Sequence, residues 1–137
     1  MEAEGWFEET AHTADLALRL QAATLPGLFA AAARGMFSLM ADLTPVQPRV
    51  KRALEVTGLD AEMLLVEWLN ELLYLHEREG ELYCRFRVVC LSPERLQAEV
   101  WGEGGHRPRR EIKAATYHDL SLRQTEGRWQ GTVVFDV

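Results

Sequence analysis

The chain has 137 residues, of which 47% are hydrophobic and 26% charged, proportions that exclude a disordered, fibrous or membrane protein. This length suffices for one hydrophobic core, so we expect a single domain over residues 1–137. The formal net charge of −6 argues against stable direct binding of nucleic acid, because such binding depends on neutralising phosphates with lysine and arginine.

The N-terminal part of the chain predicts a strand followed by a helix. Over residues 16–20, leucines alternate with alanine and arginine, which is the period of a half-buried strand. Thr24 then offers a side-chain oxygen as a helix N-cap, and Pro26 suits a first helical turn. Apolar residues recur at steps of three and four as far as Met40. We therefore expect an amphipathic helix that ends before the proline-containing stretch 42–48.

A second strand and a second helix are expected next. Residues 50–56 alternate with the period of a strand. Gly58 and Asp60 open a helix, with Asp60 as its N-cap, and Gly80 ends it. The expected buried stripe of this helix consists of Leu64, Leu65, Trp68, Leu69, Leu72 and Leu75.

The remainder of the chain predicts strands separated by turns that contain glycine or proline. These strands are expected over residues 82–91, 95–101, 111–116, 120–123 and 131–135. Two helices among about seven strands indicate an α+β fold, with two main amphipathic helices packed on a largely antiparallel or mixed β-sheet. A doubly wound parallel sheet would need more helices.

The sequence carries no feature of export or membrane insertion. Residues 1–4 are acidic and lack the basic segment, apolar stretch and cleavage site of a signal peptide. No apolar run approaches the roughly eighteen residues that a membrane-spanning helix needs. Cys84 and Cys90 are expected on one strand about 20 Å apart, beyond disulfide reach. Reduced thiols of this kind fit a cytoplasmic protein without a membrane partner.

Three polar clusters stand out against these elements. They are residues 12–15 (His-Thr-Ala-Asp), residues 113–118 (Lys-Ala-Ala-Thr-Tyr-His) and the final pair Asp136-Val137. The strand-prone run 133–135 is expected to dock up to the end of the chain and to fix that pair in place.

Taken alone, these residues also fit plainer roles. Asp15 fits a turn residue that bonds backbone amides, Asp136 a frayed tail, and Lys113 an exposed strand lysine. His12 and His118 fit hydrogen-bonded structural histidines. The residues by themselves therefore leave both kinds of role open.

With these residues in view, the chain resembles an archease. The resemblance covers nearly the whole length, and several motif blocks follow one another in order. They are Glu9 with residues 12–15, Phe29, Asp60 with residues 64–72, Gly102-Glu103 with His106, residues 112–118, and Asp136-Val137.

This resemblance implies an accessory protein rather than an enzyme. Archeases assist an RtcB-type RNA ligase, which joins RNA ends as in tRNA splicing or RNA repair. They promote guanylylation of the ligase and restore it for multiple turnover. The implied partner is therefore an RtcB-type RNA ligase.

The resemblance also implies a bound metal ion, with Asp15, Asp136 and the terminal carboxylate of Val137 as its ligands. Clustered carboxylates repel unless a proton or a cation bridges them, and oxygen ligands select hard cations. We expect calcium, with magnesium or manganese as possible alternatives; zinc is disfavoured by the few histidines and unpaired cysteines. The residues expected to orient these ligands or to contact the partner are His12, Glu103, Lys113 and His118.

Two other functions remain open at this point. One is a free-standing metal-dependent hydrolase with His118 as general base, although the chain shows no nucleophile constellation or phosphate-binding glycine loop. The other is a chaperone-like interaction module that needs no metal.

Overall fold

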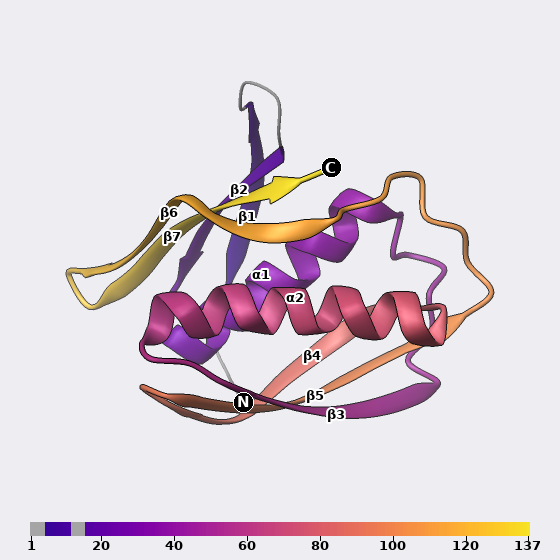
Figure 1. Cartoon of the computed structure of the whole chain (residues 1–137), viewed down its shortest axis with the longest axis horizontal. Coiled ribbons are helices and arrows are strands. Elements are labelled where there is room, and N and C mark those ends of the chain that lie inside the picture. Colours follow the sequence, from indigo (N-terminus) through magenta and orange to yellow (C-terminus); the bar gives the residue numbers. More distant parts are fainter. Residues whose placement is uncertain (1–4, 12–15) are drawn as a thin grey trace.

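The two helices lie between two antiparallel β-sheets in this computed structural model, which describes residues 5–11 and 16–137 (Figure 1). One sheet has the strand order β1-β2-β7-β6 and the other has the order β3-β5-β4. In chain order, the elements are β1 (Trp6–Ala11), β2 (Leu16–Ala22), α1 (Leu25–Met40), β3 (Val50–Thr57), α2 (Ala61–Glu79), β4 (Glu81–Ser92), β5 (Arg95–Gly104), β6 (Ala114–Thr125) and β7 (Arg128–Asp136).

The predicted α+β class is confirmed, but the strands form two sheets rather than one. The reason lies in α1, which contacts strands of both sheets and is buried on almost every side. A helix that is apolar all round needs cover on more than one face. A second sheet supplies that cover.

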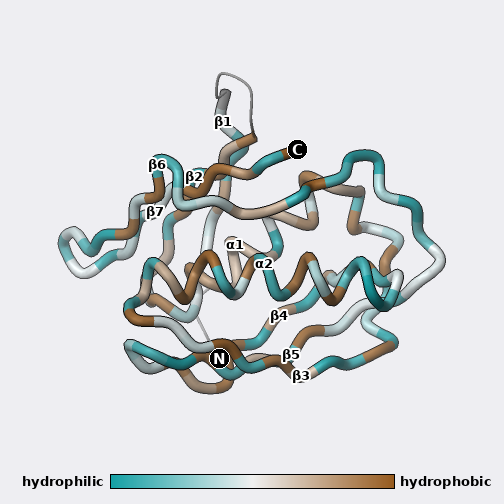
Figure 2. The backbone as a smooth tube through the Cα atoms, viewed as in Figure 1, coloured by the Kyte–Doolittle hydropathy of each residue, from teal (hydrophilic) through white to brown (hydrophobic). Residues whose placement is uncertain are grey.

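The helix boundaries follow the predicted signals. Thr24 Oγ1 accepts a hydrogen bond from the Gly27 amide at 3.1 Å, and Asp60 Oδ1 accepts one from the Met63 amide at 2.8 Å. Gly80 ends α2 in the left-handed conformation, with φ at 67°. The six residues of the predicted stripe are all buried, and Figure 2 shows hydrophobic and hydrophilic residues alternating along this helix.

Two features of the four-stranded sheet differ from the prediction. Strand β1 was not expected, and the two strands predicted over residues 111–116 and 120–123 form one strand, β6. Its register against β7 shifts between Thr116 and Ser121, and Asp119 within that bulge has φ at 51°. Residues 117–119, which the prediction left between two strands, therefore form a bulge in one strand.

Cys84 and Cys90 both lie on β4 as free thiols, as expected. Cys84 is half-buried and Cys90 is exposed, and burial raises the pKa of the Cys84 thiol. Neither helix of the described part has the length and apolarity to cross a membrane.

Candidate functional site

The C-terminal residues lie at one end of the strands of the four-stranded sheet, where the central strand β7 ends between β2 and β6 (Figure 1). On one side Phe135 pairs with Leu16, the first residue of β2. On the other side Asp136 pairs with Ala114, and the Lys113 amide donates a hydrogen bond to the Asp136 carbonyl oxygen at 2.8 Å. The last residues are thus fixed by strands on both sides, as the strand-prone run predicted.

Burial ends abruptly at the end of this strand. Phe135 is fully buried, whereas Asp136 is exposed and Val137 is 47% exposed. Within residues 5–11 and 16–137, the Asp136 carboxylate makes no hydrogen bond and no ion pair. Asp136 therefore presents a carboxylate that none of the described residues engages, at the end of a strand paired on both sides.

Asn70 of α2 holds the neighbouring strand in place. Its side-chain oxygen accepts a hydrogen bond from the Ala115 amide at 2.7 Å, and its side-chain nitrogen donates to the Ala115 carbonyl oxygen at 3.0 Å. Ala115 is only 4% exposed, so these bonds satisfy backbone groups that water does not reach. Asn70 thereby fixes the start of β6, which in turn carries Lys113 and pairs with Asp136.

Lys113 lines an open groove beside this end of the sheet. The groove has a volume of about 870 Å³ and lies between the C-terminal half of α2 and residues 106–114. Its charged or titratable lining residues are Tyr74, His76, Glu77, His106, Glu111 and Lys113. The groove therefore brings Lys113 and His106 to one surface, although they belong to two different motif blocks of the sequence.

Glu103 lies elsewhere, at the end of β5 in the three-stranded sheet. Its carboxylate accepts a hydrogen bond from the Gln47 amide at 3.0 Å, lies 2.7 Å from His106 Nε2 and forms an ion pair with Arg49 at 2.9 Å. Glu103 thus ties the loop that precedes β3 to the segment that carries His106. Glu103 therefore positions the segment that carries His106.

The hydrogen bond with His106, followed by that from the Gln47 amide, holds the pKa of the Glu103 carboxyl below its ordinary value. Stability from such a group is fully present above the ordinary glutamate pKa of about 4.3 and is lost as pH falls through the lower folded pKa. We expect the Gln47 amide proton shift in NMR spectra to titrate with a midpoint below about 4.3. Glu103→Gln should abolish this titration and lower the free energy of unfolding more at neutral pH than below about pH 3. A midpoint at or above the ordinary value would contradict the assigned hydrogen bonds.

His118 lies in the bulge of β6, beyond the part of the strand that Asn70 holds. Its side chain is 65% exposed, and its Nε2 atom lies 3.3 Å from Asp119 Oδ2. Lys113 directly precedes the strand that carries it, but the groove beside Lys113 does not include His118.

The other predicted residues, His12 and Asp15, lie outside the described residues. Within the described parts of the chain, no group of three or more histidine, cysteine, aspartate or glutamate side chains is arranged to hold a metal ion. The expected ligand set includes Asp15, so the metal site stays a prediction.

Asn70 was not among the predicted site residues, although the sequence carries a signal for it. Asparagine is unfavourable within a helix, because its side chain competes for backbone hydrogen bonds. Here it follows Trp68 and Leu69 directly and precedes Leu72, all three of them buried. A polar residue beside a buried stripe is expected to have a tertiary partner.

Comparisons with known proteins show the family of this chain. The chain matches the Archease protein family (MTH1598/TM1083) over residues 7–137. It is 40% identical to protein archease of Thermococcus gammatolerans, over 96% of this chain and 98% of that protein. Protein archease of Pyrococcus furiosus is 35% identical with the same coverage.

Two solved structures share the fold. The solution structure of Methanobacterium thermoautotrophicum protein 1598 has a TM-score of 0.79 and 29% identity, covering 96% of this chain and 98% of that one. The crystal structure of TM1083 from Thermotoga maritima, an archease described as a possible chaperone, has a TM-score of 0.65 and 20% identity, with coverage of 95% and 96%. With a family match over nearly its whole length and relatives of this similarity, the chain belongs to the archease protein family.

Proposed function

We propose that this protein is a metal-binding accessory protein that activates an RtcB-type RNA ligase by promoting its guanylylation and multiple turnover. In this role it carries out no chemistry of its own. Its carboxylates hold a divalent cation, calcium before magnesium or manganese, and present it to the partner.

One observation supports this function more than any other: the pairing of Leu16 with Phe135. Asp15 is covalently joined to Leu16, and Asp136 to Phe135. The antiparallel register needs to continue by only one residue to set Asp15 opposite Asp136. Facing side chains in such a pair have Cβ atoms about 5 Å apart, close enough for two carboxylates to share one ion.

The donor set fits a hard cation. Asp136 is exposed, and none of the described residues occupies its carboxylate oxygens. The terminal carboxylate of Val137 would add a third acidic group, and several carboxylates in proximity favour a bound cation because it offsets their repulsion. The cation would supply fixed positive charge next to the phosphates handled by the ligase.

Lys113 is proposed to assist the terminal carboxylate. The pairing of Ala114 with Asp136, continued by one step, sets Lys113 opposite Val137. Side chains of neighbouring strand residues lie on opposite faces, so this ammonium group lies on the face opposite the Asp136 side chain. It can offset the charge of the terminal carboxylate of Val137 or contact a phosphate carried by the partner. His12 and His118 are proposed to orient the ligands or to meet the partner.

The deciding experiment measures guanylylation of the cognate RtcB-type ligase with GTP and divalent metal, in the presence and absence of this protein. We expect a faster rate and more than one ligation per ligase molecule when the protein is added. An unchanged rate would reject activation of the ligase. Calorimetric titration with Ca²⁺ and Mg²⁺ tests the metal separately, and absence of binding at millimolar ion would favour a metal-free chaperone-like module.

A further inference from the structure

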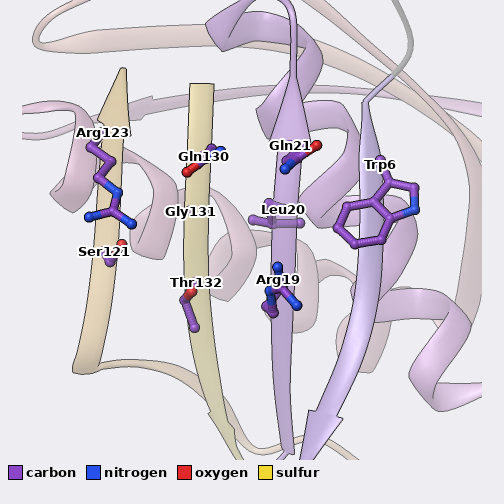
Figure 3. A pocket seen from close by; sticks show the side chains of 9 residues that line it. All are labelled: Trp6, Arg19, Leu20, Gln21, Ser121, Arg123, Gln130, Gly131 and Thr132. Atoms are coloured by element: carbon purple, nitrogen blue, oxygen red, sulfur yellow. The ribbon is translucent and has the colours of Figure 1, made fainter. Parts of the chain in front are cut away.

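The outer face of the four-stranded sheet carries a small polar hollow of about 110 Å³, well away from the groove beside Lys113 (Figure 3). One row of its lining crosses all four strands through directly paired residues: Trp6, Gln21, Gln130 and Arg123. The adjacent row consists of Arg19, Thr132 and Ser121. The hollow is thus built from regular strand pairing.

Strand alternation turns these side chains outward. Leu20 and Gly131, which lie between the two rows, face α1: Leu20 is 1% exposed, and a Cβ at Gly131 would lie 3.8 Å from Leu28. At the start of β1, Gly5 lies against α1, where a Cβ would come within 2.6 Å of Ala31. Trp6 therefore points to the opposite face, and Figure 3 shows the helices behind the strands that carry these side chains.

The lining of the hollow consists of donors and one aromatic ring. It contains two guanidinium groups, two amides and two hydroxyls but no carboxylate, although the whole chain has 21 acidic and 15 basic residues. Arg123 makes no hydrogen bond or ion pair within the described residues. Arg19 shares one exposed contact with Glu8 at 3.2 Å, and such a contact is worth little and exchanges readily. Trp6 is 44% exposed.

We propose that this hollow binds a short segment of single-stranded nucleic acid, with a backbone phosphate between Arg19 and Arg123 and one base stacked on Trp6. Arginine presents a planar fork of donors that matches phosphate oxygens. An exposed indole ring gives any base a surface for stacking. Gln21 and Gln130 lie between these groups and can bond to base edges or sugar hydroxyls.

The length of the row favours a strand over a mononucleotide. Four adjacent strands span about 14 Å at their usual spacing. Stacked nucleotides of one strand advance by about 3.4 Å each, so about four of them cover this distance, and extended ones cover it with fewer. A ligand that reaches from Trp6 to Arg123 therefore contains more than one nucleotide.

The net charge of −6 limits how tightly this hollow can bind. One or two phosphate contacts predict a shallow salt dependence, with log affinity falling by about 0.7 to 1.4 per unit of log salt. Binding should thus be weak and confined to the hollow. This is compatible with the net charge, which argues against stable nucleic-acid binding over a wide surface.

The test is an NMR titration of the isotope-labelled protein, without ligase or metal, with a single-stranded oligouridylate of about eight nucleotides. We expect saturable shifts of the Trp6 indole N–H and of the amides of Arg19, Arg123 and Gln130. Uridine monophosphate and inorganic phosphate should bind at least several-fold more weakly. Absent shifts, shifts confined to another surface, or equally tight binding of the monophosphate would overturn the assignment.

Variants make the assignment sharper. Trp6→Ala should lower the affinity at least fivefold, the smallest loss expected when one base–aromatic stack is removed, while Trp6→Phe should retain most of it. Arg123→Gln should weaken binding and reduce the salt slope by about 0.7. Tyr74→Ala on α2 and Arg87→Gln on β4 are matched controls, because both residues are exposed and far from the hollow in sequence and fold. If the controls weakened binding as much as the hollow variants, the proposal would be wrong, whatever the ligase assay shows.

Discussion

Asp136→Asn is expected to abolish stimulation of the ligase while leaving the fold intact. The side chain is exposed, and the main-chain bond from the Lys113 amide to the Asp136 carbonyl oxygen does not depend on the carboxylate. Asparagine has the same shape but removes one negative charge and one oxygen of the proposed metal site. Because losing even a residue that supports a metal ligand costs about 10- to 100-fold in affinity, loss of a ligand itself should cost at least about 100-fold.

Calorimetry with Ca²⁺ and the guanylylation assay measure the two effects of this change, and thermal unfolding checks the fold. Glu126→Gln is the matched control, because it removes one exposed carboxylate at the β6–β7 turn, away from the proposed site. The control should bind metal and stimulate the ligase as the unchanged protein does. Full stimulation by the Asp136→Asn protein would show that this carboxylate has no part in the site.

Asn70→Ala is expected to lower the free energy of unfolding by about 2–4 kcal/mol. The change leaves the amide and carbonyl of Ala115 without their partners at a position that is 4% exposed, and each buried unsatisfied group costs about 1–3 kcal/mol. Alanine favours helix more than asparagine does, but by at most about 0.7 kcal/mol, so the loss of hydrogen bonds dominates. Urea unfolding at neutral pH measures the difference.

The same variant should reduce stimulation of the ligase, because the start of β6 would no longer be held to α2 beside Asp136. Glu71→Ala is the control, since it makes a comparable truncation at the next position of the helix and should change stability by no more than about 0.5 kcal/mol. Equal stabilities of the two variants would show that the Asn70 hydrogen bonds contribute little.

Local signals in the sequence were sufficient to predict both helices. The caps Thr24 and Asp60 and the terminator Gly80 act on atoms within a few residues of themselves. The spacing of the buried stripe of α2 likewise follows from the helical period. Such signals are readable from sequence because the partners are neighbours in the chain.

Other features depend on residues far apart in the chain. Strand β1 has a mixed composition and is stabilised by its pairing with β2 and by the packing of Gly5 and Phe7 against the core. The bulge in β6 is visible only in the register against β7. Asn70 could be suspected from its type, but its partner lies 45 residues away.

The sequence by itself therefore determined the helices, the α+β class and the family. Tertiary structure decided that the strands divide into two sheets around α1, that Asp136 is fixed between β2 and β6, and that Glu103 bonds to the loop before β3. It also formed the hollow around Arg123. Caps and periodicity are set by interactions within a few residues, whereas strand order and register depend on which distant apolar faces can be buried together.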